Sequence, residues 1–258
     1  MILDAIVAAK RAAHERRPPR SLDELLAEAQ SMAPARPLRD ALVDGRRTRP
    51  RAIAEFKRRS PSAGPIRPGA DPAEVVPGYA RAGAAAISVL TDEEFFDGRI
   101  EHLGRARAAC ALPVLRKDFL LDERDLLEAR LAGADAALLI ARLLPDGRLR
   151  ALLETARAAG LEALVEVHDE RELERALAAG ADPIGVNHRD LDTLAIDLSL
   201  SSRLRRLAPP SVALVAESGL RGPDDVRRVA DAGIDAILVG EALMRAPDPG
   251  AALRALLG

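Results

Sequence analysis

The 258-residue chain has few of the residues that mark several protein classes. A single cysteine, Cys110, excludes an intrachain disulfide framework and fits a reducing compartment. Aromatic residues make up 2% and the formal charge is −2, so neither a base-stacking surface nor a polyanion partner is indicated. No apolar run reaches about 18 residues, and the N-terminus has no long apolar signal region. We therefore expect a cytoplasmic globular protein that binds neither nucleic acid nor membrane.

Lysine and asparagine are also scarce, although charged residues are 30% of the chain. Only Lys10, Lys57 and Lys117 are lysines among 38 basic residues, and Asn187 is the only asparagine. Lysine carries a proton that it can transfer, whereas arginine keeps its proton at any physiological pH. The positions of the lysines are therefore candidates for chemistry.

Short apolar runs recur along the chain and predict buried parallel strands, because they are too continuously apolar for half-exposed antiparallel ones. Eight runs start between residues 53 and 235, a mean spacing of (235 − 53)/7 = 26 residues. The expected strands cover residues 53–56, 85–90, 112–116, 134–140, 162–167, 182–187, 212–216 and 235–240.

Helix start and stop signals lie between these runs. Asp71-Pro72 places a cap before a first-turn proline, and Asp169 with Glu172 forms the pattern of a capping box. Ala-Gly pairs predict helix ends, where glycine takes the left-handed conformation. The five glycines concerned are Gly83, Gly133, Gly160, Gly180 and Gly233.

Eightfold strand–helix alternation predicts an α/β fold, the (β/α)8 TIM barrel, over residues 46–258. The alternative is a doubly wound open sheet, which usually has fewer strands and a glycine-rich loop after the first. Residues 58–62, which follow the first expected strand, contain no GxGxxG pattern. Helical patterns near 2–17, 21–31 and 37–43 predict a helical N-terminal extension over residues 1–45, packed on the barrel.

Polar residues gather where the expected strands end, which is the edge at which TIM barrels carry their chemistry. Two of the three lysines and the only asparagine are among them. Inward-pointing charges do not serve stability, because burying an unpaired charge costs several kcal/mol. Glu55 and Lys57 share one side of a strand, since they are two residues apart. A solvated pair at the rim is the alternative interpretation for them.

The last two strand ends predict a phosphate site. The segments AESG and VGEALM bring backbone amides to the barrel mouth, and EALM begins a short helix. Loops in these positions form the usual phosphate cradle of TIM barrels. Glycines needed only for tight turns are the alternative. The four histidines show no metal-ligand spacing, so no metal site is expected.

Seven ordered motifs together resemble the indole-3-glycerol phosphate synthase family of tryptophan biosynthesis. They are EFKRRSPSAGPI, SVLTDEEFF, PVLRKDF, LVEVHDEREL, GVNHRDL, AESGL and VGEALM. The resemblance implies a carboxy-lyase that acts on 1-(2-carboxyphenylamino)-1-deoxyribulose 5-phosphate. C1 of the anthranilate ring attacks the C2′ carbonyl, and carbon dioxide and then water leave. No cofactor or metal is implied.

The resemblance also implies roles for individual residues. Lys117 is the general acid that protonates the carbonyl oxygen and assists loss of the hydroxyl, and Glu166 is its acid/base partner in the dehydration. Lys57, positioned by Glu55, lies near the anthranilate carboxylate and can also donate a proton. Asn187 and Glu217 hold substrate hydroxyls and the lysines. Substrate-binding positions are Ser60 for the carboxylate, Phe96 and Phe119 for the aryl group, and Arg189, Ser218, Gly219, Gly240 and Glu241 for the phosphate.

Proton delivery to a developing alkoxide gives this assignment a physical reason. A lysine among other cations can have its pKa lowered toward neutrality, which suits a general acid. We expect Lys57 and Lys117 to lower each other's pKa, while the nearby glutamates act in the opposite direction. Arginine could replace neither lysine, because it does not give up its proton.

Three features depart from the family pattern. His188 stands where a second asparagine is usual, and its side chain is expected to point away from the barrel axis. Asp97 stands where a glycine is common, so the shape of its loop is open. The N-terminal extension lacks an aromatic residue that some relatives place over the substrate, which predicts looser aryl packing.

Two alternatives to the synthase remain. Another phosphate-binding barrel enzyme is one: phosphoribosylanthranilate isomerase would need a Cys/Asp pair, for which Cys110 is badly placed, and a Schiff-base aldolase would use Lys117. A catalytically dead barrel that only binds phosphorylated metabolites or a partner is the other, and the complete set of charged residues argues against it. The chain is expected to be a monomer or a homodimer.

Overall fold

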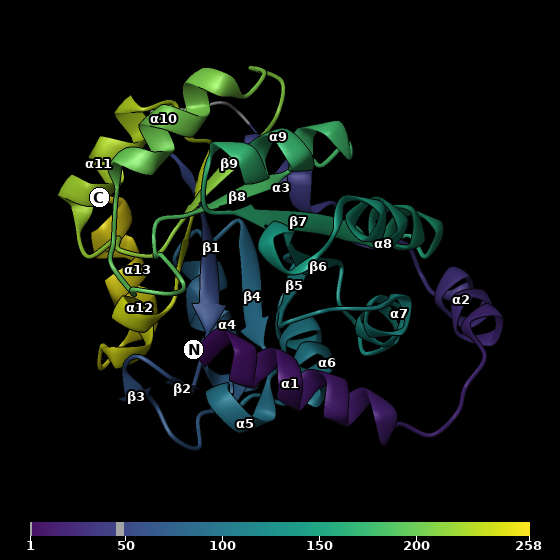
Figure 1. The fold of residues 1–258 in the computed structure, drawn as a ribbon. Coiled ribbons are helices and arrows are strands. Elements are labelled where there is room, and N and C mark those ends of the chain that lie inside the picture. Colours follow the sequence, from purple (N-terminus) through teal and green to yellow (C-terminus); the bar gives the residue numbers. More distant parts are fainter. Residues whose placement is uncertain (1, 45–48) are drawn as a thin grey trace.

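Eight parallel strands close into a barrel in the computed structural model, which describes residues 2–44 and 49–258. Around the barrel they follow the order β1-β10-β9-β8-β7-β6-β5-β4, and β4 pairs again with β1 (Figure 1). Helices connect successive strands, so the predicted TIM barrel is confirmed.

The helices and strands have the following bounds in chain order: α1 (Ile2–Glu15), α2 (Leu22–Ser31), α3 (Leu38–Val43), β1 (Arg51–Phe56), β2 (Arg59–Ser60), β3 (Gly64–Pro65), α4 (Pro72–Arg81), β4 (Ala86–Leu90), α5 (Glu93–Phe96), α6 (Glu101–Ala109), β5 (Val114–Lys117), α7 (Glu123–Leu131), β6 (Ala136–Ile140), η1 (Ala141–Leu143), α8 (Asp146–Ala158), β7 (Glu162–Val167), α9 (Glu170–Ala178), β8 (Ile184–Asn187), α10 (Ser199–Leu207), β9 (Leu214–Glu217), α11 (Pro223–Asp231), β10 (Ala236–Val239), α12 (Glu241–Arg245) and α13 (Pro249–Leu257).

The local signals in the sequence explain most of these boundaries. The five predicted helix-ending glycines all have positive φ angles, between 64° and 99°. Asp71 accepts a hydrogen bond from the amide of Ala73 at the start of α4, and Asp169 accepts one from Glu172 at the start of α9. The second half of the predicted box at α9 is wrong. The Glu172 carboxylate accepts from the amide of His168, one residue before the cap.

Helix α3 closes the N-terminal end of the barrel. Leu38 and Leu42 are fully buried against interior strand residues, among them Ile53 and Leu115. The amide of Arg39 donates to the carboxylate of Glu162 at the start of β7, at 2.7 Å. The interior below the mouth is therefore apolar. The boundary expected between residues 45 and 46 lies outside the described residues.

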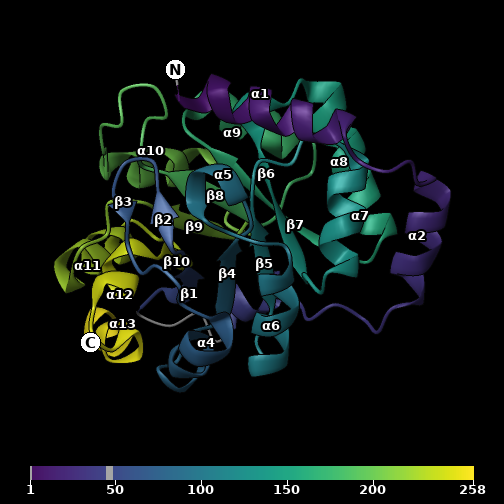
Figure 2. The ribbon, with the colours of Figure 1, turned by 90° about the horizontal axis from the view of Figure 1, so that it is seen from below.

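Helix α1 lies at the opposite end, toward which the arrows of β1 and β4 point (Figures 1 and 2). Its apolar side buries Leu3 and Ile6. Lys10 reaches two carboxylates of the barrel, with its Nζ 2.9 Å from Asp92 and 2.7 Å from Asp118. The N-terminal extension therefore covers part of the mouth.

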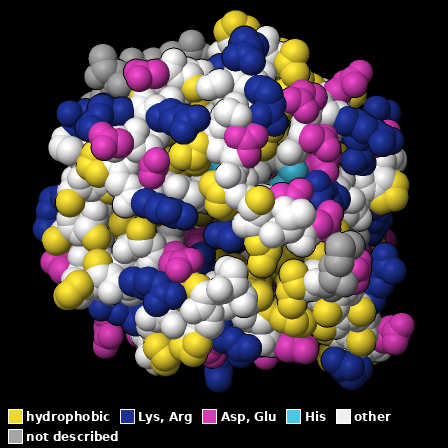
Figure 3. Space-filling view, turned by 60° about the vertical axis from the view of Figure 1, so that its left-hand side comes forward, with side chains coloured by type: hydrophobic (Ala, Val, Ile, Leu, Met, Phe, Trp, Pro, Cys, Tyr) yellow, Lys and Arg dark blue, Asp and Glu magenta, His cyan; other side chains and the backbone are white. Residues whose placement is uncertain are grey.

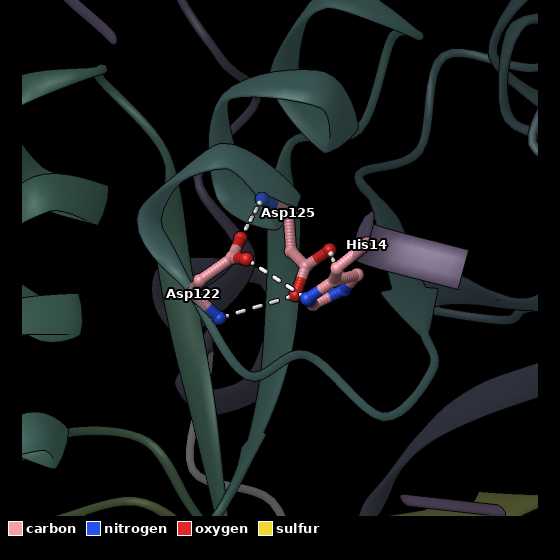
Figure 4. A group of neighbouring side chains, drawn as sticks. All are labelled: His14, Asp122 and Asp125. Atoms are coloured by element: carbon pink, nitrogen blue, oxygen red, sulfur yellow. Dashed lines mark hydrogen bonds and ion pairs between the residues drawn. The ribbon is translucent and has the colours of Figure 1, made fainter. Parts of the chain in front are cut away.

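His14 of α1, drawn with its two carboxylate partners in Figure 4, and Arg17, which follows the helix, continue this contact. The ring nitrogens of His14 lie 2.9 Å from Asp122 and 3.0 Å from Asp125, and Arg17 binds Asp125 as well. Donor atoms of His14, Asp122 and Asp125 gather within 4.8 Å, an arrangement that can hold a cation and that sequence spacing does not reveal. Here the ring of His14 and the guanidinium of Arg17 already contact these carboxylates. The cluster therefore fastens α1 to the start of α7.

Two loops at the mouth carry short elements that the sequence did not predict. The loop after β1 forms the hairpin β2–β3, and the loop after β4 contains α5, which packs against β2. Asp97 ends α5 in the left-handed conformation, with φ 52°. Aspartate visits this conformation more readily than most residues. The loop therefore forms without the glycine that is common at this position.

The surface carries no block of charge of one sign on the face shown in Figure 3, where basic and acidic side chains are interspersed. Within residues 2–44 and 49–258, the helices are too short or too polar to cross a membrane.

Candidate active site

A cavity of about 400 Å³ opens at the barrel mouth and brings together all the site residues predicted from the sequence. Strand ends, the loop after β1, α5 and α1 contribute to its wall. The predicted residues that line it are Glu55, Lys57, Ser60, Phe96, Lys117, Phe119, Glu166, Asn187, Arg189, Glu217, Ser218, Gly219, Gly240 and Glu241.

Lys117 ends β5 and lies between two glutamates. Its Nζ is 3.0 Å from Glu166 at the end of β7 and 3.5 Å from Glu217 at the end of β9. Burial alone would lower the pKa of Lys117, but Glu166, Glu217 and Glu55 outweigh burial and raise it. The expected lowering of its pKa is therefore wrong for the protein without substrate. Carboxylates, rather than the second lysine, dominate the field at this ammonium.

Glu166 is held through both of its carboxylate oxygens. One faces Lys117, and the other accepts a hydrogen bond from the Asn187 side-chain amide at 2.9 Å. The Asn187 oxygen in turn accepts from the backbone amide of Arg189 at 3.1 Å, which fixes the orientation of the amide. Burial alone would raise the pKa of Glu166, but Lys117 and His168 lower it. Glu166 is thus an ionised, oriented base beside the ammonium.

The carboxyl group of Glu217 differs from that of Glu166, because its pKa is raised rather than lowered. Burial and the nearby Glu166 and Glu55 carboxylates outweigh Lys117 and raise the pKa of Glu217 to about 8. Among the described residues, one of its oxygens, Oε1, has no hydrogen-bond partner although it is buried. Gly185 on β8 provides the space for it, because any Cβ there would collide with this carboxylate. Glu217 therefore has hydrogen-bonding capacity to offer a substrate.

Glu55 and Lys57 form a close pair at the end of β1, with 2.6 Å between Nζ and Oε1. Their side chains are 5% and 16% exposed, so the interpretation as a solvated rim pair is wrong. Gly240 leaves room for this pair as well, since a Cβ there would collide with the Glu55 carboxylate. The glycine predicted for phosphate binding thus also shapes the charged floor of the cavity.

The predicted phosphate end has an unusual backbone. Ser218 and Gly219 follow each other with φ angles of 66° and 79°, and α12 begins at Glu241 nearby in the cavity wall. Successive amides in such conformations form concave anion sites, and the strain of a non-glycine residue at positive φ is typical of functional positions.

His188 contacts the predicted phosphate end, and its side chain points away from the barrel axis, as expected. Its ring is buried, and burial lowers its pKa, so the ring is neutral at pH 7. Nδ1 donates to the Ser218 carbonyl at 3.0 Å, so Nε2 accepts from the Ser201 hydroxyl at 2.6 Å. His188 thereby fixes the carbonyl of the residue that carries the positive φ angle.

The opposite end of the cavity is apolar. The rings of Phe96 and Phe119 are 6.1 Å apart with a 39° tilt. Ile2, Leu3 and Ile6 of α1 add aliphatic wall. Ser60 is buried in the hairpin, and its hydroxyl accepts from the amide of Ala63 at 3.2 Å. An aromatic group with a carboxylate fits these surroundings.

Several residues that line or support the site were not predicted. They include Leu3 and Ile6, and also Leu191 and Leu194 from the loop after β8. Leucine and isoleucine at helical spacing look the same whether they face a core or a ligand. His168 was interpreted as a structural or rim residue, and it contacts Glu166.

Comparison with known proteins agrees with this geometry. The family model described as indole-3-glycerol phosphate synthase matches residues 3–256. The chain belongs to the indole-3-glycerol phosphate synthase family. Indole-3-glycerol phosphate synthase 2 of Streptomyces coelicolor is 51% identical, and the match covers 100% of this chain and 99% of the relative. Indole-3-glycerol phosphate synthase of a Nocardioides species is 48% identical, with 100% and 98% covered.

A solved structure outside the indole-3-glycerol phosphate synthase family shares the fold. Thiamine phosphate pyrophosphorylase from Pyrococcus furiosus aligns with a TM-score of 0.62 at 21% identity, covering 85% of this chain and 96% of that one. At this identity the likeness concerns the barrel alone, because one barrel fold hosts many reactions.

Proposed function

We propose that this protein is an indole-3-glycerol-phosphate synthase. It converts 1-(2-carboxyphenylamino)-1-deoxyribulose 5-phosphate into indole-3-glycerol phosphate, carbon dioxide and water in tryptophan biosynthesis. The observation that carries the proposal is Lys117 held between Glu166 and Glu217 in a cavity that is lined by the Phe96–Phe119 pair and by the positive-φ turn at Ser218 and Gly219.

The two ends orient the substrate. The phosphate binds at Ser218, Gly219 and the start of α12, which line the cavity. The anthranilate ring lies near Phe96 and Phe119, and its carboxylate lies toward Lys57 and Ser60. This pose brings the C2′ carbonyl between the ends, within reach of Lys117. Holding the two reacting carbons together removes much of the entropic barrier to ring closure.

Lys117 supplies the proton in the first step. As C1 of the ring attacks C2′, the carbonyl oxygen becomes an alkoxide and takes the proton of the ammonium. A raised pKa keeps Lys117 protonated until that moment, and an alkoxide is basic enough to remove the proton. The carboxylate then leaves as carbon dioxide, and its bonding electrons restore the aromatic ring.

Glu166 acts in the dehydration. Lys117 first regains a proton from solvent; the hydroxyl then leaves from C2′ as water with that proton, and Glu166 takes a proton from the adjacent carbon to form the indole double bond. Glu217, with its raised pKa, donates a hydrogen bond to a substrate oxygen. Glu55 orients Lys57 toward the substrate carboxylate. No step needs a cofactor or a metal.

The proposal also covers the domain organisation, the location in the cell and the oligomeric state. Residues 1–45 form a helical extension of the barrel over residues 46–258. The enzyme works in the cytoplasm as a monomer or homodimer on a phosphorylated small molecule, without nucleic acid or membrane partners.

Indole fluorescence on addition of the carboxyphenylamino-deoxyribulose phosphate tests the function. The chain has no tryptophan, so the product signal rises on a low background. We expect steady growth of indole emission together with carbon dioxide release. A protein that binds this substrate without forming indole contradicts the proposal. Covalent trapping of the substrate on Lys117 by borohydride would instead favour a Schiff-base aldolase.

A further inference from the structure

A row of alternating charges runs from the protein surface to Lys117 through Glu166. Arg142 in η1 lies 3.0 Å from Glu172 in α9, and Glu172 lies 3.0 Å from Nδ1 of His168. Nε2 of His168 lies 3.2 Å from Oε1 of Glu166, whose other oxygen contacts Lys117. The row therefore alternates cation and carboxylate up to the ammonium group of Lys117.

His168 is the least exposed cationic group in this row. Its side chain is 2% exposed, and each ring nitrogen faces a carboxylate. The Nδ1 contact is a hydrogen bond, whereas the Nε2 contact is an ion pair whose geometry is too poor for a hydrogen bond. An imidazole that is buried between two carboxylates is most stable as the imidazolium. Burial alone would lower the pKa of His168, but Glu166 and Glu172 raise it to about 9.

Glu172 fixes this cation in place from behind. Its Oε2 accepts from both the His168 amide, at 2.8 Å, and the ring. Its Oε1 accepts from Arg142, which also contacts Asp192 in the loop after β8, at 3.4 Å. The carboxylate that the sequence pattern assigned to a helix cap thus orients the imidazole instead.

We propose that His168 is a positioning residue that keeps Glu166 ionised and oriented while Lys117 is without its proton. This inference rests on the proposed function, because it concerns the order of proton transfers in that reaction. His168 does not touch the substrate in it. It acts through Glu166 alone.

The surroundings of Glu166 explain why a second cation is needed. The ionisable groups that act on it are Lys117 from β5, Glu217 from β9 and His168 next to its own strand, while Glu55 from β1 acts on Lys117 and Glu217. Once Lys117 has given its proton to the leaving hydroxyl, His168 is the cation that still contacts Glu166. Burial would then favour protonation of Glu166, and a protonated Glu166 cannot accept the proton that leaves in the dehydration.

The pH dependence of turnover tests this role in the full-length enzyme. His168→Gln removes the charge and keeps an amide donor. We expect the acidic limb of the kcat profile to move upward by about 1–3 pH units, the range for losing a close opposite charge. kcat at pH 7 falls, while KM for the carboxyphenylamino-deoxyribulose phosphate changes little. Glu172→Gln moves the limb in the same direction by less, because His168 then loses its carboxylate partner.

A double variant and a matched histidine control complete the test. Because both single changes act through one cation, His168→Gln with Glu172→Gln shifts the limb no further than His168→Gln alone. His102 in α6 is also buried, packed edge-on against Phe56 with 5.5 Å between ring centroids. His102→Gln lowers the melting temperature without moving the limb.

An unmoved limb in His168→Gln, with kcat reduced by the same factor at every pH, overturns the inference. If His168→Gln does not fold, an unmoved limb in Glu172→Gln overturns it equally. A wild-type protein that forms no indole contradicts the proposed function itself. Wild-type turnover with an unshifted variant profile contradicts the role of His168 alone.

Discussion

Two lysines of this molecule each lie between two carboxylates at the barrel mouth. Lys10 of α1 is 2.9 Å from Asp92 and 2.7 Å from Asp118, and Lys117 is 3.0 Å from Glu166 and 3.5 Å from Glu217. Their side chains are 17% and 16% exposed, and in both cases carboxylates outweigh burial and raise the pKa. By charge and burial alone the two sites look the same.

The hydrogen-bond partners of the carboxylates distinguish the site of Lys10 from the site of Lys117. Asp118 accepts further hydrogen bonds from Thr91, Arg116 and the amide of Phe119. Glu217 instead keeps a buried oxygen beside the cavity that has no partner in the part of the chain that the structure describes. A fully paired buried network rigidifies a structure, whereas an unpaired buried atom needs a functional reason. Lys10 therefore fastens α1, and Lys117 is available for chemistry.

The largest expected effect is the loss of kcat on replacing Lys117. Lys117→Ala removes the proposed general acid, and kcat should fall by about 10²–10⁴-fold, the usual contribution of a positioned acid. Lys10→Ala should keep most of kcat. Steady-state indole fluorescence measures both variants. Equal losses of kcat would remove the distinction between the two lysines.

Replacing Lys10 should have the larger effect on stability. Lys10→Met leaves Asp92 and Asp118 buried without their shared cation, and breaking a buried ion pair costs about 3–5 kcal/mol. The free energy of unfolding, from urea or guanidinium titration, should fall by that amount. Lys10→Arg, which keeps the charge, should recover part of it. An unchanged unfolding midpoint in Lys10→Met would mean that α1 is not held by this contact.

Acid should weaken the network of Lys10 through its carboxylates. Burial alone would raise the pKa of Asp118, but Arg116 and Lys10 hold it below its usual range. A carboxyl group with a lowered pKa in the folded state stabilises the fold above its unfolded pKa of about 3.9, and this stabilisation is lost as pH falls below that value. The free energy of unfolding should therefore drop from pH 5 toward pH 3. Asp118→Asn should be less stable at pH 7 and should lose less on acidification.

The smallest expected effect comes from replacing Ser218, and it distinguishes substrate binding, measured by KM, from the chemical step, measured by kcat. Ser218 contributes to the proposed phosphate end and lies away from the proton-transfer groups. Ser218→Ala should raise KM by about tenfold, the loss of roughly one hydrogen bond to a charged group, and should leave kcat nearly unchanged. Inorganic phosphate should inhibit the variant correspondingly less. A fall in kcat with constant KM would assign Ser218 to the chemical step.

The sequence predicted those features for which one physical requirement produces a recognisable local pattern. The period of the apolar runs predicted the barrel, and the Ala-Gly pairs predicted backbone turns whose φ angles are positive. The residues at strand ends could be assigned to one cavity because parallel strands in a barrel share a mouth. The scarcity of lysine indicated Lys57 and Lys117 as candidates for chemistry. It did not predict that Lys10 binds Asp92 and Asp118.

Other features depend on which groups meet in space, and no local pattern records this. The direction of the pKa shift of Lys117 follows from three glutamates on three different strands. Glu172 looked like half of a capping box, and its carboxylate turns back to His168. Gly185 has a role only because the carboxylate of Glu217 occupies the space beside it.

The kcat of Lys117→Arg, measured by indole fluorescence, tests the central claim most directly. Arginine keeps the positive charge between Glu166 and Glu217 but does not give up its proton at working pH. If Lys117 acts by proton transfer, Lys117→Arg is as inactive as Lys117→Ala while its melting temperature stays close to that of the wild type. Turnover by Lys117→Arg near the wild-type rate would contradict the claim, because charge alone would then be enough.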